Sequence, residues 1–221
     1  MSTTLREIIP RSPIHALGRW LFSLHCFTVF NTYLKLKVHG KQHLPEGPFI
    51  ICSNHQSHLD AIILSHIGAF FFSRSAMIAA KDYWFDDKMR FFFSRFFFCT
   101  IPISRRETTK GFGIIETTRL VKEFVANKGR SIVILPEGTR SMDEKIKPFK
   151  KGVVTLSKIT DLPIVPVYIQ DSGRFWPKGS FFIKPGNLTI RIGKPIFPSD
   201  LSEYSDGSIV RERIIELANY E

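Results

Sequence analysis

A short apolar run that ends in a cluster of polar residues most restricts how this chain folds. Residues 49–52 read Phe-Ile-Ile-Cys, and residues 53–60 read Ser-Asn-His-Gln-Ser-His-Leu-Asp. The apolar run predicts a buried strand. Ser57 and Asp60, three residues apart, form a capping-box pattern, which predicts that a helix follows and includes residues 61–67. The sequence therefore predicts a strand, a turn and a helix, with His55 in the turn.

His55 and Asp60 are the residue types that general-base catalysis of acyl transfer requires. An imidazole can take a proton from a hydroxyl near neutral pH, and a carboxylate fixes its tautomer and stabilises the imidazolium. On one continuous helix the separation of five would place the two side chains about 140° apart, so we expect His55 to precede the helix and fold back onto Asp60. Two alternatives stay open from spacing alone. Asp60 merely caps the helix while His55 is solvated, or His55, His58 and Asp60 bind a metal ion.

A second apolar run ends in polar residues about 80 residues further along the chain. Residues 131–135, Ser-Ile-Val-Ile-Leu, are typical of a buried strand, and residues 136–140 read Pro-Glu-Gly-Thr-Arg. Gly138 permits close approach of the backbone, Thr139 offers a hydroxyl, and Arg140 offers a planar fork that suits a phosphate. Taken alone, this segment is more simply interpreted as an ordinary turn.

Together the two motifs resemble the glycerol-phosphate and lysophospholipid acyltransferase family, the PlsC-like enzymes. The family signature Asn-His-x4-Asp matches residues 54–60, and Pro-Glu-Gly-Thr-Arg matches residues 136–140. Residues 101–105, Ile-Pro-Ile-Ser-Arg, are similar to the second family block, and residues 162–168 are similar to the fourth. The resemblance extends from about residue 38 to about residue 198. Two intact blocks and two recognisable ones are far more specific than a single motif.

The resemblance implies an O-acyltransferase that acts in phospholipid biosynthesis. It would move a fatty acyl group from acyl-CoA or acyl carrier protein to the free hydroxyl of 1-acylglycerol 3-phosphate, which gives phosphatidic acid. Beyond this thioester co-substrate, neither a metal nor a redox cofactor is expected. The residues implied are the catalytic pair His55 and Asp60, and the substrate-binding residues Arg105, Glu137, Gly138, Thr139 and Arg140, with Lys81 as a further phosphate candidate.

The second block departs from the family pattern. Pro102 and Ser104 stand where the family more often has an apolar or aromatic residue and an acid, and the arginine is doubled as Arg105 and Arg106. We assign phosphate binding to Arg105 because it follows Ile-x as the family arginine does. The lysines at positions 147, 150 and 151 are weaker candidates, since a solvated basic face explains them equally.

Two other functions stay open. One is acylation of another lysolipid, such as a lyso-ornithine lipid or a lysophospholipid. The other is a non-enzymatic basic module that binds membranes or nucleic acid, although such a module has no need of paired catalytic blocks.

Composition favours a polyanionic partner. Lys and Arg total 31 against 20 acidic residues, a formal net charge of +11, which suits anionic lipid, nucleic acid or phosphorylated substrates. The 21 phenylalanines include blocks at 70–72, 91–93 and 96–98, unlike the interleaved aromatic and basic residues that stack on nucleic-acid bases. Core positions explain any single phenylalanine equally well. We expect an anionic membrane surface as a partner and no nucleic acid.

The N-terminal residues 1–37 are expected to form a membrane-associated helical segment ahead of a catalytic domain at residues 38–221. Residues 17–33 are apolar most of the way round a helix, but Arg19, His25 and Asn31 interrupt them. They fall short of the ~20 apolar residues that span a bilayer. A monotopic interfacial anchor or a re-entrant helix fits this pattern, and a buried helix that covers the sheet is the alternative.

Cysteine usage bears on the compartment. Cys26, Cys52 and Cys99 are widely spaced and form no Cys-x-x-Cys pair, which favours reduced thiols over a disulfide framework. Residues 1–13 lack the profile of a signal peptide. We expect a membrane-associated protein on the cytoplasmic face, at the inner membrane if the source is bacterial.

Strand-like and helix-like segments alternate along the chain. Strands are expected at residues 49–53, 132–135, 164–169 and 188–192, and helices at 61–67, 111–126, 151–158 and 209–220. This alternation predicts an α/β fold with a central, mostly parallel or mixed sheet flanked by helices.

Overall fold

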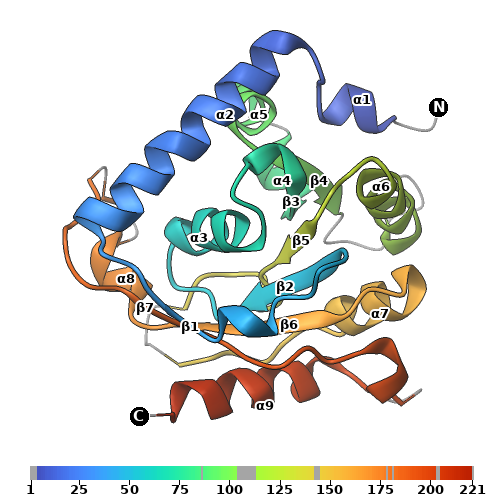
Figure 1. Ribbon diagram of the computed structural model, residues 1–221. Coiled ribbons are helices and arrows are strands. Elements are labelled where there is room, and N and C mark those ends of the chain that lie inside the picture. The colour runs from blue at the N-terminus through green and yellow to red at the C-terminus, as the bar shows by residue number, and fades with distance from the viewer. Residues whose placement is uncertain are drawn as a thin grey trace.

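The computed structural model of the protein describes residues 4–85, 87–103, 113–141, 145–177, 179–180, 182–202 and 205–220. Within these residues the centre of the fold is a seven-stranded sheet in the order β1-β7-β6-β2-β5-β3-β4 (Figure 1). The strands are β1 (Lys37–His39), β2 (Phe49–Ser53), β3 (Ser75–Ala80), β4 (Cys99–Ile103), β5 (Ser131–Ile134), β6 (Ile164–Ile169) and β7 (Thr189–Ile192). The helices are α1 (Leu5–Ile8), α2 (Pro13–Thr28), α3 (His58–Gly68), α4 (Lys81–Trp84), α5 (Lys88–Phe97), α6 (Ile114–Ala126), α7 (Gly152–Thr160), α8 (Ser172–Phe175) and α9 (Gly207–Ala218).

The sheet is mixed, with one antiparallel pair among the pairs described. β6, β2, β5, β3 and β4 run parallel to one another, and β1 runs parallel to β7. β7 pairs antiparallel with β6, with Ile192 opposite Val167. The predicted α/β fold with a mostly parallel or mixed sheet is confirmed. Parallel strands are covered on both faces, which explains why β2 and β5 appear in the sequence as nearly continuous apolar runs.

Each face of the sheet has its own core, and β2 contributes to both. Ile50 and Cys52 belong to the core that includes residues of α1, α6, α7 and α9, whereas Phe49 and Ile51 belong to the core that includes residues of α2 and α3. All four side chains are fully buried. Successive side chains of a strand point to opposite faces, so one apolar run fills two cores. Figure 1 shows α6, α7 and α9 on one side of the sheet and α2 and α3 on the other.

The structure contains β3, β4 and α5, which the sequence analysis did not predict. β3 carries several alanines, and small residues weaken the strand signal. β4 contains Pro102, which cannot donate to a ladder but is tolerated here because β4 is an edge strand. α3 begins at His58, three residues before the expected start, because Ser57 is its N-cap.

α2 has one face in the core and one face exposed. Cys26 and the following Phe30 are buried against the sheet side, as is the guanidinium of Arg19. Leu17 and Leu21, in contrast, are about half exposed, at 54% and 51%. The helix thus covers the core with one face and exposes apolar side chains on the other. Among the described residues, no helix combines the length and apolar character needed to cross a bilayer.

Asn54 joins the end of β2 to the end of β6. Its Nδ2 donates to the main-chain oxygen of Ile169, and its Oδ1 accepts from the Ile169 main-chain N–H, both at 2.9 Å. Asn54 is buried and Ile169 is fully buried, so water does not replace these bonds. The amide thereby fixes the point at which the chain leaves the sheet and enters the turn that carries His55.

We predict that Asn54→Ala lowers the free energy of unfolding by about 1–3 kcal/mol for each Ile169 group left without this partner. Urea unfolding of the purified variant measures the loss. Asn187→Ala, at an exposed position, is the matched control and should change stability little. Equal unfolding midpoints for the two variants would contradict this role of Asn54.

Candidate active site

The two sequence motifs meet because they follow neighbouring parallel strands. β2 pairs with β5, with Cys52 opposite Ile134, so both strands end at the same edge of the sheet. His55 lies in the turn after β2, and residues 136–140 follow β5. In open α/β sheets, ligand sites form at the carboxyl ends of parallel strands. A separation of 82 residues in sequence therefore becomes direct contact between His55 and Glu137.

His55 is held by Asp60. The Nδ1 atom of His55 lies 3.0 Å from Oδ2 of Asp60, and the histidine side chain is 14% exposed while the aspartate is fully buried. A carboxylate only accepts hydrogen bonds, so Nδ1 carries the hydrogen and Nε2 carries the lone pair. Nε2 is then the atom able to take a proton. The predicted fold-back of His55 onto Asp60 is observed, and Asp60 caps α3 as well.

Oδ2 of Asp60 organises the whole turn. Besides His55 Nδ1, it accepts from the main-chain N–H of Gln56 at 2.7 Å and of Ser57 at 2.8 Å. Ser57 Oγ accepts from the N–H of Leu59, which completes the cap. One oxygen thus fixes the backbone of the turn and the ring that lies above it.

The second motif holds the main chain of His55. Oε1 of Glu137 accepts from the His55 N–H at 2.9 Å, and the N–H of Ser141 donates to the His55 carbonyl at 2.7 Å. Glu137 is buried, and burial raises the pKa of its carboxyl, although hydrogen bonds from main-chain N–H groups, including that of His55, oppose the rise. The glutamate of Pro-Glu-Gly-Thr-Arg therefore lies behind His55, and it does not line the cavity.

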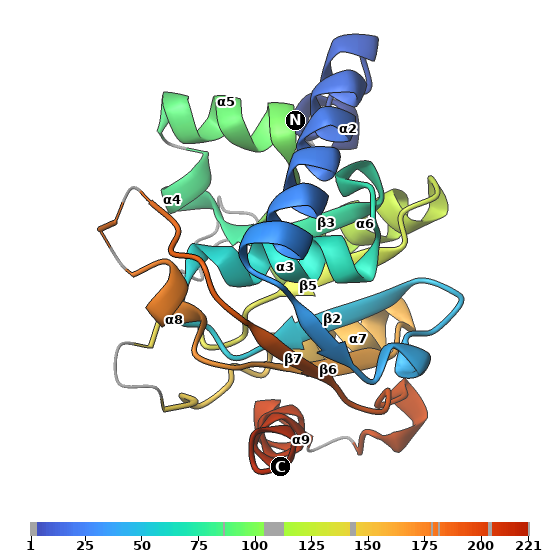
Figure 2. The ribbon, with the colours of Figure 1, turned by 60° about the vertical axis from the view of Figure 1, so that its left-hand side comes forward.

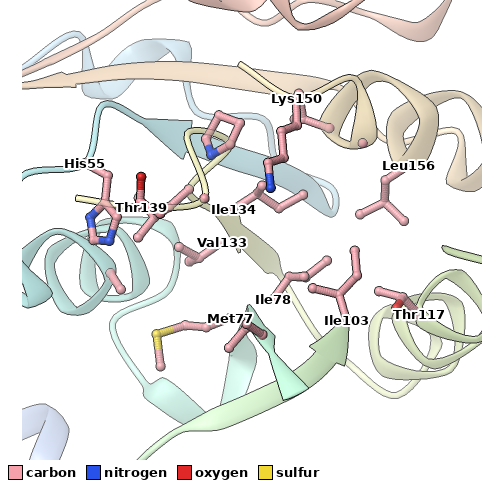
Figure 3. Close-up of a pocket in the computed structure, with 18 of the residues that line it drawn as sticks. His55, Met77, Ile78, Ile103, Thr117, Val133, Ile134, Thr139, Lys150 and Leu156 are labelled. Atoms are coloured by element: carbon pink, nitrogen blue, oxygen red, sulfur yellow. The ribbon is translucent and has the colours of Figure 1, made fainter. Parts of the chain in front are cut away.

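A cavity of about 530 Å³ opens in front of His55. Figure 3 shows His55 and Thr139 at one end, with Lys150 pointing into the space between the ends. The other end is apolar and lies between the sheet and helices α6 and α7. The apolar side chains that line the cavity include Met77, Ile78, Ile103, Val133, Ile134, Val153 and Leu156. The cavity thus joins a polar end, where His55 lies, to an apolar interior.

Gly138 has a backbone conformation that favours glycine. Its φ is +73°, and a Cβ at this position would lie 3.0 Å from Nζ of Lys150. The absence of a side chain lets the Lys150 ammonium pass close to the turn. Among the described residues, no carboxylate lies within salt-bridge distance of Lys150. Arg140 lines the same cavity, so two cations are available to an anionic substrate group.

His58 also lines the cavity, but its environment differs from that of His55. Its pKa is lowered to about 4, mainly by burial and to a smaller extent by the charges of Arg140, His55 and Arg90, while Asp60 opposes the shift. Its ring makes an edge contact with Trp176 at 6.1 Å between centroids. His58 is therefore neutral at physiological pH and acts as part of the wall.

The remaining predicted residues lie as follows. Gly138, Thr139 and Arg140 line the cavity. Lys81 begins α4 at the end of β3, on the same sheet edge, but it is not among the residues that line the cavity. Arg105 lies outside the described residues. Among the described residues, no group of three or more His, Cys, Asp or Glu side chains is placed to hold a metal ion.

Sequence reasoning missed the structural roles of Asn54, Glu137 and Ser141. Asn54 and Glu137 were recognised as motif residues, but their hydrogen-bond partners belong to strands distant in sequence. Ser141 directly follows the second motif, and no local signal distinguishes it.

Comparison with known proteins agrees with this site. Residues 35–170 match the family model described as Acyltransferase, which is more than half of the chain. The chain belongs to the Acyltransferase family. The matched region includes the His55 turn and the Pro-Glu-Gly-Thr-Arg segment.

Curated relatives of this family member are similar along most of its length. A 1-acyl-sn-glycerol-3-phosphate acyltransferase of Brassica napus, named BAT2 and chloroplastic, is 30% identical over 193 residues, covering 85% of this chain and 52% of the relative. One from Saccharomyces cerevisiae is 29% identical over 208 residues, covering 90% and 66%. One from Pseudomonas aeruginosa is 26% identical over 191 residues, covering 84% and 70%. The chain spans about half the length of the first of these relatives.

A solved structure shares the fold. The 1-acyl-sn-glycerophosphate acyltransferase PlsC of Thermotoga maritima superimposes with a TM-score of 0.63 at 25% identity, covering 91% of this chain and 78% of that one. The seven-stranded mixed sheet flanked by helices is therefore the fold of this family member as well.

We predict that Glu137→Gln keeps the fold and most of the turnover, because its amide oxygen can still accept from the His55 N–H. Glu137→Ala leaves that N–H unpaired and should cost about 1–3 kcal/mol of stability, with a loss of turnover as the turn loosens. Because burial raises the pKa of Glu137 above its usual 4.5, its contribution to stability is present at low pH and is lost as pH rises through the raised pKa.

Glu137→Gln should therefore gain stability relative to the wild type as pH rises from about 4 to 8. Thermal unfolding across this range measures it. The exposed Glu212→Gln is the control and should follow the wild type. If the difference in unfolding temperature between Glu137→Gln and the wild type were the same at all pH values, the buried Glu137 carboxyl would not have a raised pKa.

Proposed function

We propose that this chain transfers a fatty acyl group from acyl-CoA or acyl carrier protein to the free hydroxyl of 1-acylglycerol 3-phosphate, giving phosphatidic acid in phospholipid biosynthesis. The observation that carries the proposal is the His55–Asp60 pair at the mouth of a cavity that is cationic at one end and apolar at the other. The names of the relatives in Brassica napus, Saccharomyces cerevisiae and Pseudomonas aeruginosa support the same reaction.

The proposed chemistry needs no covalent enzyme intermediate. Nε2 of His55 takes the proton of the acceptor hydroxyl while the hydroxyl oxygen attacks the thioester carbonyl carbon. Asp60 stabilises the imidazolium that forms. The tetrahedral intermediate collapses with cleavage of the carbon–sulfur bond, and the proton on His55 goes to the leaving thiolate. The products are the ester and a free thiol, so His55 returns to its neutral state.

The cations at the cavity mouth favour a phosphate on the acceptor. Arg140 can bind phosphate through a planar pair of donors, and Lys150 adds a point charge. Both line the cavity that His55 faces. By resemblance we propose that Arg105 also holds the glycerol phosphate and that Lys81 assists. An acceptor without phosphate, such as a lyso-ornithine lipid, would leave these cations with less to bind.

The apolar end of the cavity suits a fatty acyl chain. It is lined by Ile78, Ile103, Val133 and Leu156 among others, and Thr117 there uses its hydroxyl to donate to Pro102 at 2.9 Å. The lining therefore exposes little unmet polarity to a chain. Apolar surface buried by an acyl chain contributes about 0.8 kcal/mol for each methylene group.

We further propose that the protein works at an anionic membrane surface, on the cytoplasmic face, and at the inner membrane if its source is bacterial. The formal net charge of +11 and the exposed apolar side of α2 support this. The cysteines Cys26, Cys52 and Cys99 are free and buried, and burial raises the pKa of Cys26 to about 12 and of Cys99 to about 11. Unreactive free thiols fit a reducing compartment.

An acceptor and donor panel with purified protein tests the proposal. We predict acylation of 1-acylglycerol 3-phosphate in preference to a lysophospholipid with a larger headgroup and to a lyso-ornithine lipid, with acyl-CoA and acyl carrier protein compared as donors. His55→Ala should lower turnover by roughly two to four orders of magnitude and leave donor binding intact.

His58→Ala is the matched control, since it removes a histidine from the same turn. It should have a much smaller effect and leave any pH-rate inflection between about 5 and 8 in place, because burial keeps the pKa of His58 near 4. A folded His55→Ala variant with normal turnover would falsify the assignment of the base.

Arg140→Ala should raise the Michaelis constant for 1-acylglycerol 3-phosphate by roughly tenfold to a hundredfold, the usual worth of a charge-assisted bond to phosphate. The constant for the acyl donor should stay nearly unchanged. Steady-state kinetics with each substrate varied in turn measures both constants. Arg213→Ala on α9 serves as the control because the Arg213 side chain is 58% exposed. A rise for the donor alone would reassign Arg140 to the donor side.

A further inference from the structure

The exposed side of α2 is an unusually apolar surface. Its large exposed side chains are Ile14, Leu17, Trp20, Leu21, Leu24 and Phe27. At 100° per residue these positions share one broad stripe on the side opposite the buried Arg19 and Cys26. A helix that is apolar on both sides lacks the polar outer face of an ordinary surface helix.

α5 extends this surface. Met89, Phe92, Phe93 and Phe96 recur at the helical spacing of three and four residues, and the first three are exposed, Met89 at 64% and Phe92 at 55%. Phe70 and Phe71 add two more exposed rings, with Phe70 against Phe27 at 5.5 Å between centroids. In the described residues, eleven of the seventeen exposed large apolar side chains thus lie on α2, α5 and residues 70–71, which we call the α2–α5 face.

Two contacts fix the two helices as one surface. α2 crosses α5 at Gly18, where a Cβ would lie 2.5 Å from the ring of Phe96, so any larger residue would force this ring to shift. The buried Arg19 donates from Nη1 to the Arg95 carbonyl at 3.0 Å and from Nη2 to the Pro10 carbonyl at 2.6 Å. Gly18 has Ile14 and Leu21 as its neighbours along α2, so α5 meets α2 at the edge of the exposed stripe. Figure 2 shows α5 and α2 together at the same end of the molecule.

A basic cleft lies where the two helices meet. It has a volume of about 240 Å³ and is lined by His15, Lys88, Phe91, Phe92 and Arg95. The guanidinium of Arg95 lies 5.1 Å from the centre of the Phe91 ring, which holds it beside the apolar surface. Among the described residues, neither Lys88 nor Arg95 has a carboxylate within salt-bridge distance. The neighbouring Asp87 caps α5 by accepting from the Arg90 N–H at 2.8 Å.

We propose that the α2–α5 face seats in an anionic phospholipid bilayer and that the basic cleft, through Lys88 and Arg95, holds the phosphate of a lipid headgroup. A bilayer offers apolar chains to the phenylalanines and a negative layer at the depth of the two cations, so it complements both parts of the surface. A second copy of the chain fits less well, because an isologous contact would bring the same unpaired cations together. This inference rests on the proposed membrane location and assigns it to particular residues on α5 as well as α2.

The surface is connected to the active site through the chain. α5 follows α4 after a short link, and Trp84 of α4 lines the cavity in front of His55. Seating α5 in the bilayer would therefore bring the cavity near the phase from which a lysolipid and its product exchange.

Flotation of the full chain on vesicles tests the apolar part of the face. The vesicles contain phosphatidylcholine and phosphatidylglycerol, neither of which is the proposed substrate or product. The double variant Phe92→Ser, Phe93→Ser should bind at least roughly tenfold more weakly than the wild type, because two apolar side chains no longer enter the bilayer. Phe182 lies outside the α2–α5 face and is 82% exposed, so Phe182→Ser is the matched control and should bind as the wild type does.

The basic cleft has its own pair of variants. The double variant Lys88→Gln, Arg95→Gln should bind the mixed vesicles roughly thirtyfold more weakly than the wild type, because two basic residues at an anionic surface are worth about that much. On vesicles of pure phosphatidylcholine, the variant and the wild type should bind equally. Lys122→Gln, Lys194→Gln removes the same net charge from exposed positions elsewhere and should cost much less. Equal losses for the two pairs would overturn the headgroup site and leave only diffuse attraction.

Two further readouts separate the explanations. Flotation of Phe92→Ser, Phe93→Ser at the wild-type level would overturn the docking face. A wild-type dimer in lipid-free buffer that becomes monomeric in this variant would also overturn it, since a second copy would then cover the face. Turnover with a short-chain, water-soluble 1-acylglycerol 3-phosphate should be retained by every variant, which shows that each is folded. If no variant and no wild type acylates that acceptor while the flotation pattern holds, the proposed reaction fails and the docking face stands.

Discussion

One carboxylate oxygen supports the chemistry of this protein. Oδ2 of Asp60 accepts hydrogen bonds from the His55 ring and from two consecutive main-chain N–H groups, and the residue is fully buried. Bonds to a charged acceptor are worth about 1.5–3 kcal/mol each, so the three together set the path of the chain and the direction of the imidazole. The same atom is the cap of α3 and the partner of the proposed base. The tautomer of His55 and the start of the helix therefore cannot be changed independently.

The two motifs act as a reciprocal clamp. The His55 N–H is held by Glu137, and the His55 carbonyl is held by Ser141, so the turn after β2 has its main chain fixed by the loop after β5. The loop in turn presents Gly138, Thr139 and Arg140 to the cavity. Motif residues thus divide into those that hold the backbone and those that line the cavity. Preorganisation of this kind removes the need to order the site when substrate arrives.

The buried cation Arg19 has a comparable role at the other end of the molecule. It satisfies two main-chain carbonyls, one from the segment before α2 and one from α5, and so ties three pieces of chain together. A desolvated guanidinium is costly unless its donors are met. Both of its Nη atoms are met by these carbonyls, whereas its buried Nε has no hydrogen-bond partner among the described residues.

The sequence alone is enough to predict the α/β class, the strands β2, β5, β6 and β7 and the capped turn at His55. These depend on local signals, because side-chain periodicity and capping need only neighbouring residues. It also predicted the pairing of His55 with Asp60, since the two residues are close along the chain. The alanine-rich β3 and the proline-containing β4 carry no such signal, and the sequence predicts neither of them.

Long-range packing sets which strands are neighbours, and with that the partners of Asn54, Glu137 and Ser141. Glu137 was expected to line the acceptor pocket by resemblance, but the pairing of β2 with β5 places its carboxylate behind His55 instead. The joining of α2 and α5 into one apolar surface likewise depends on a contact between Gly18 and Phe96 that no local pattern contains. Contacts between residues far apart in sequence follow from strand order and helix packing, which local patterns leave undetermined.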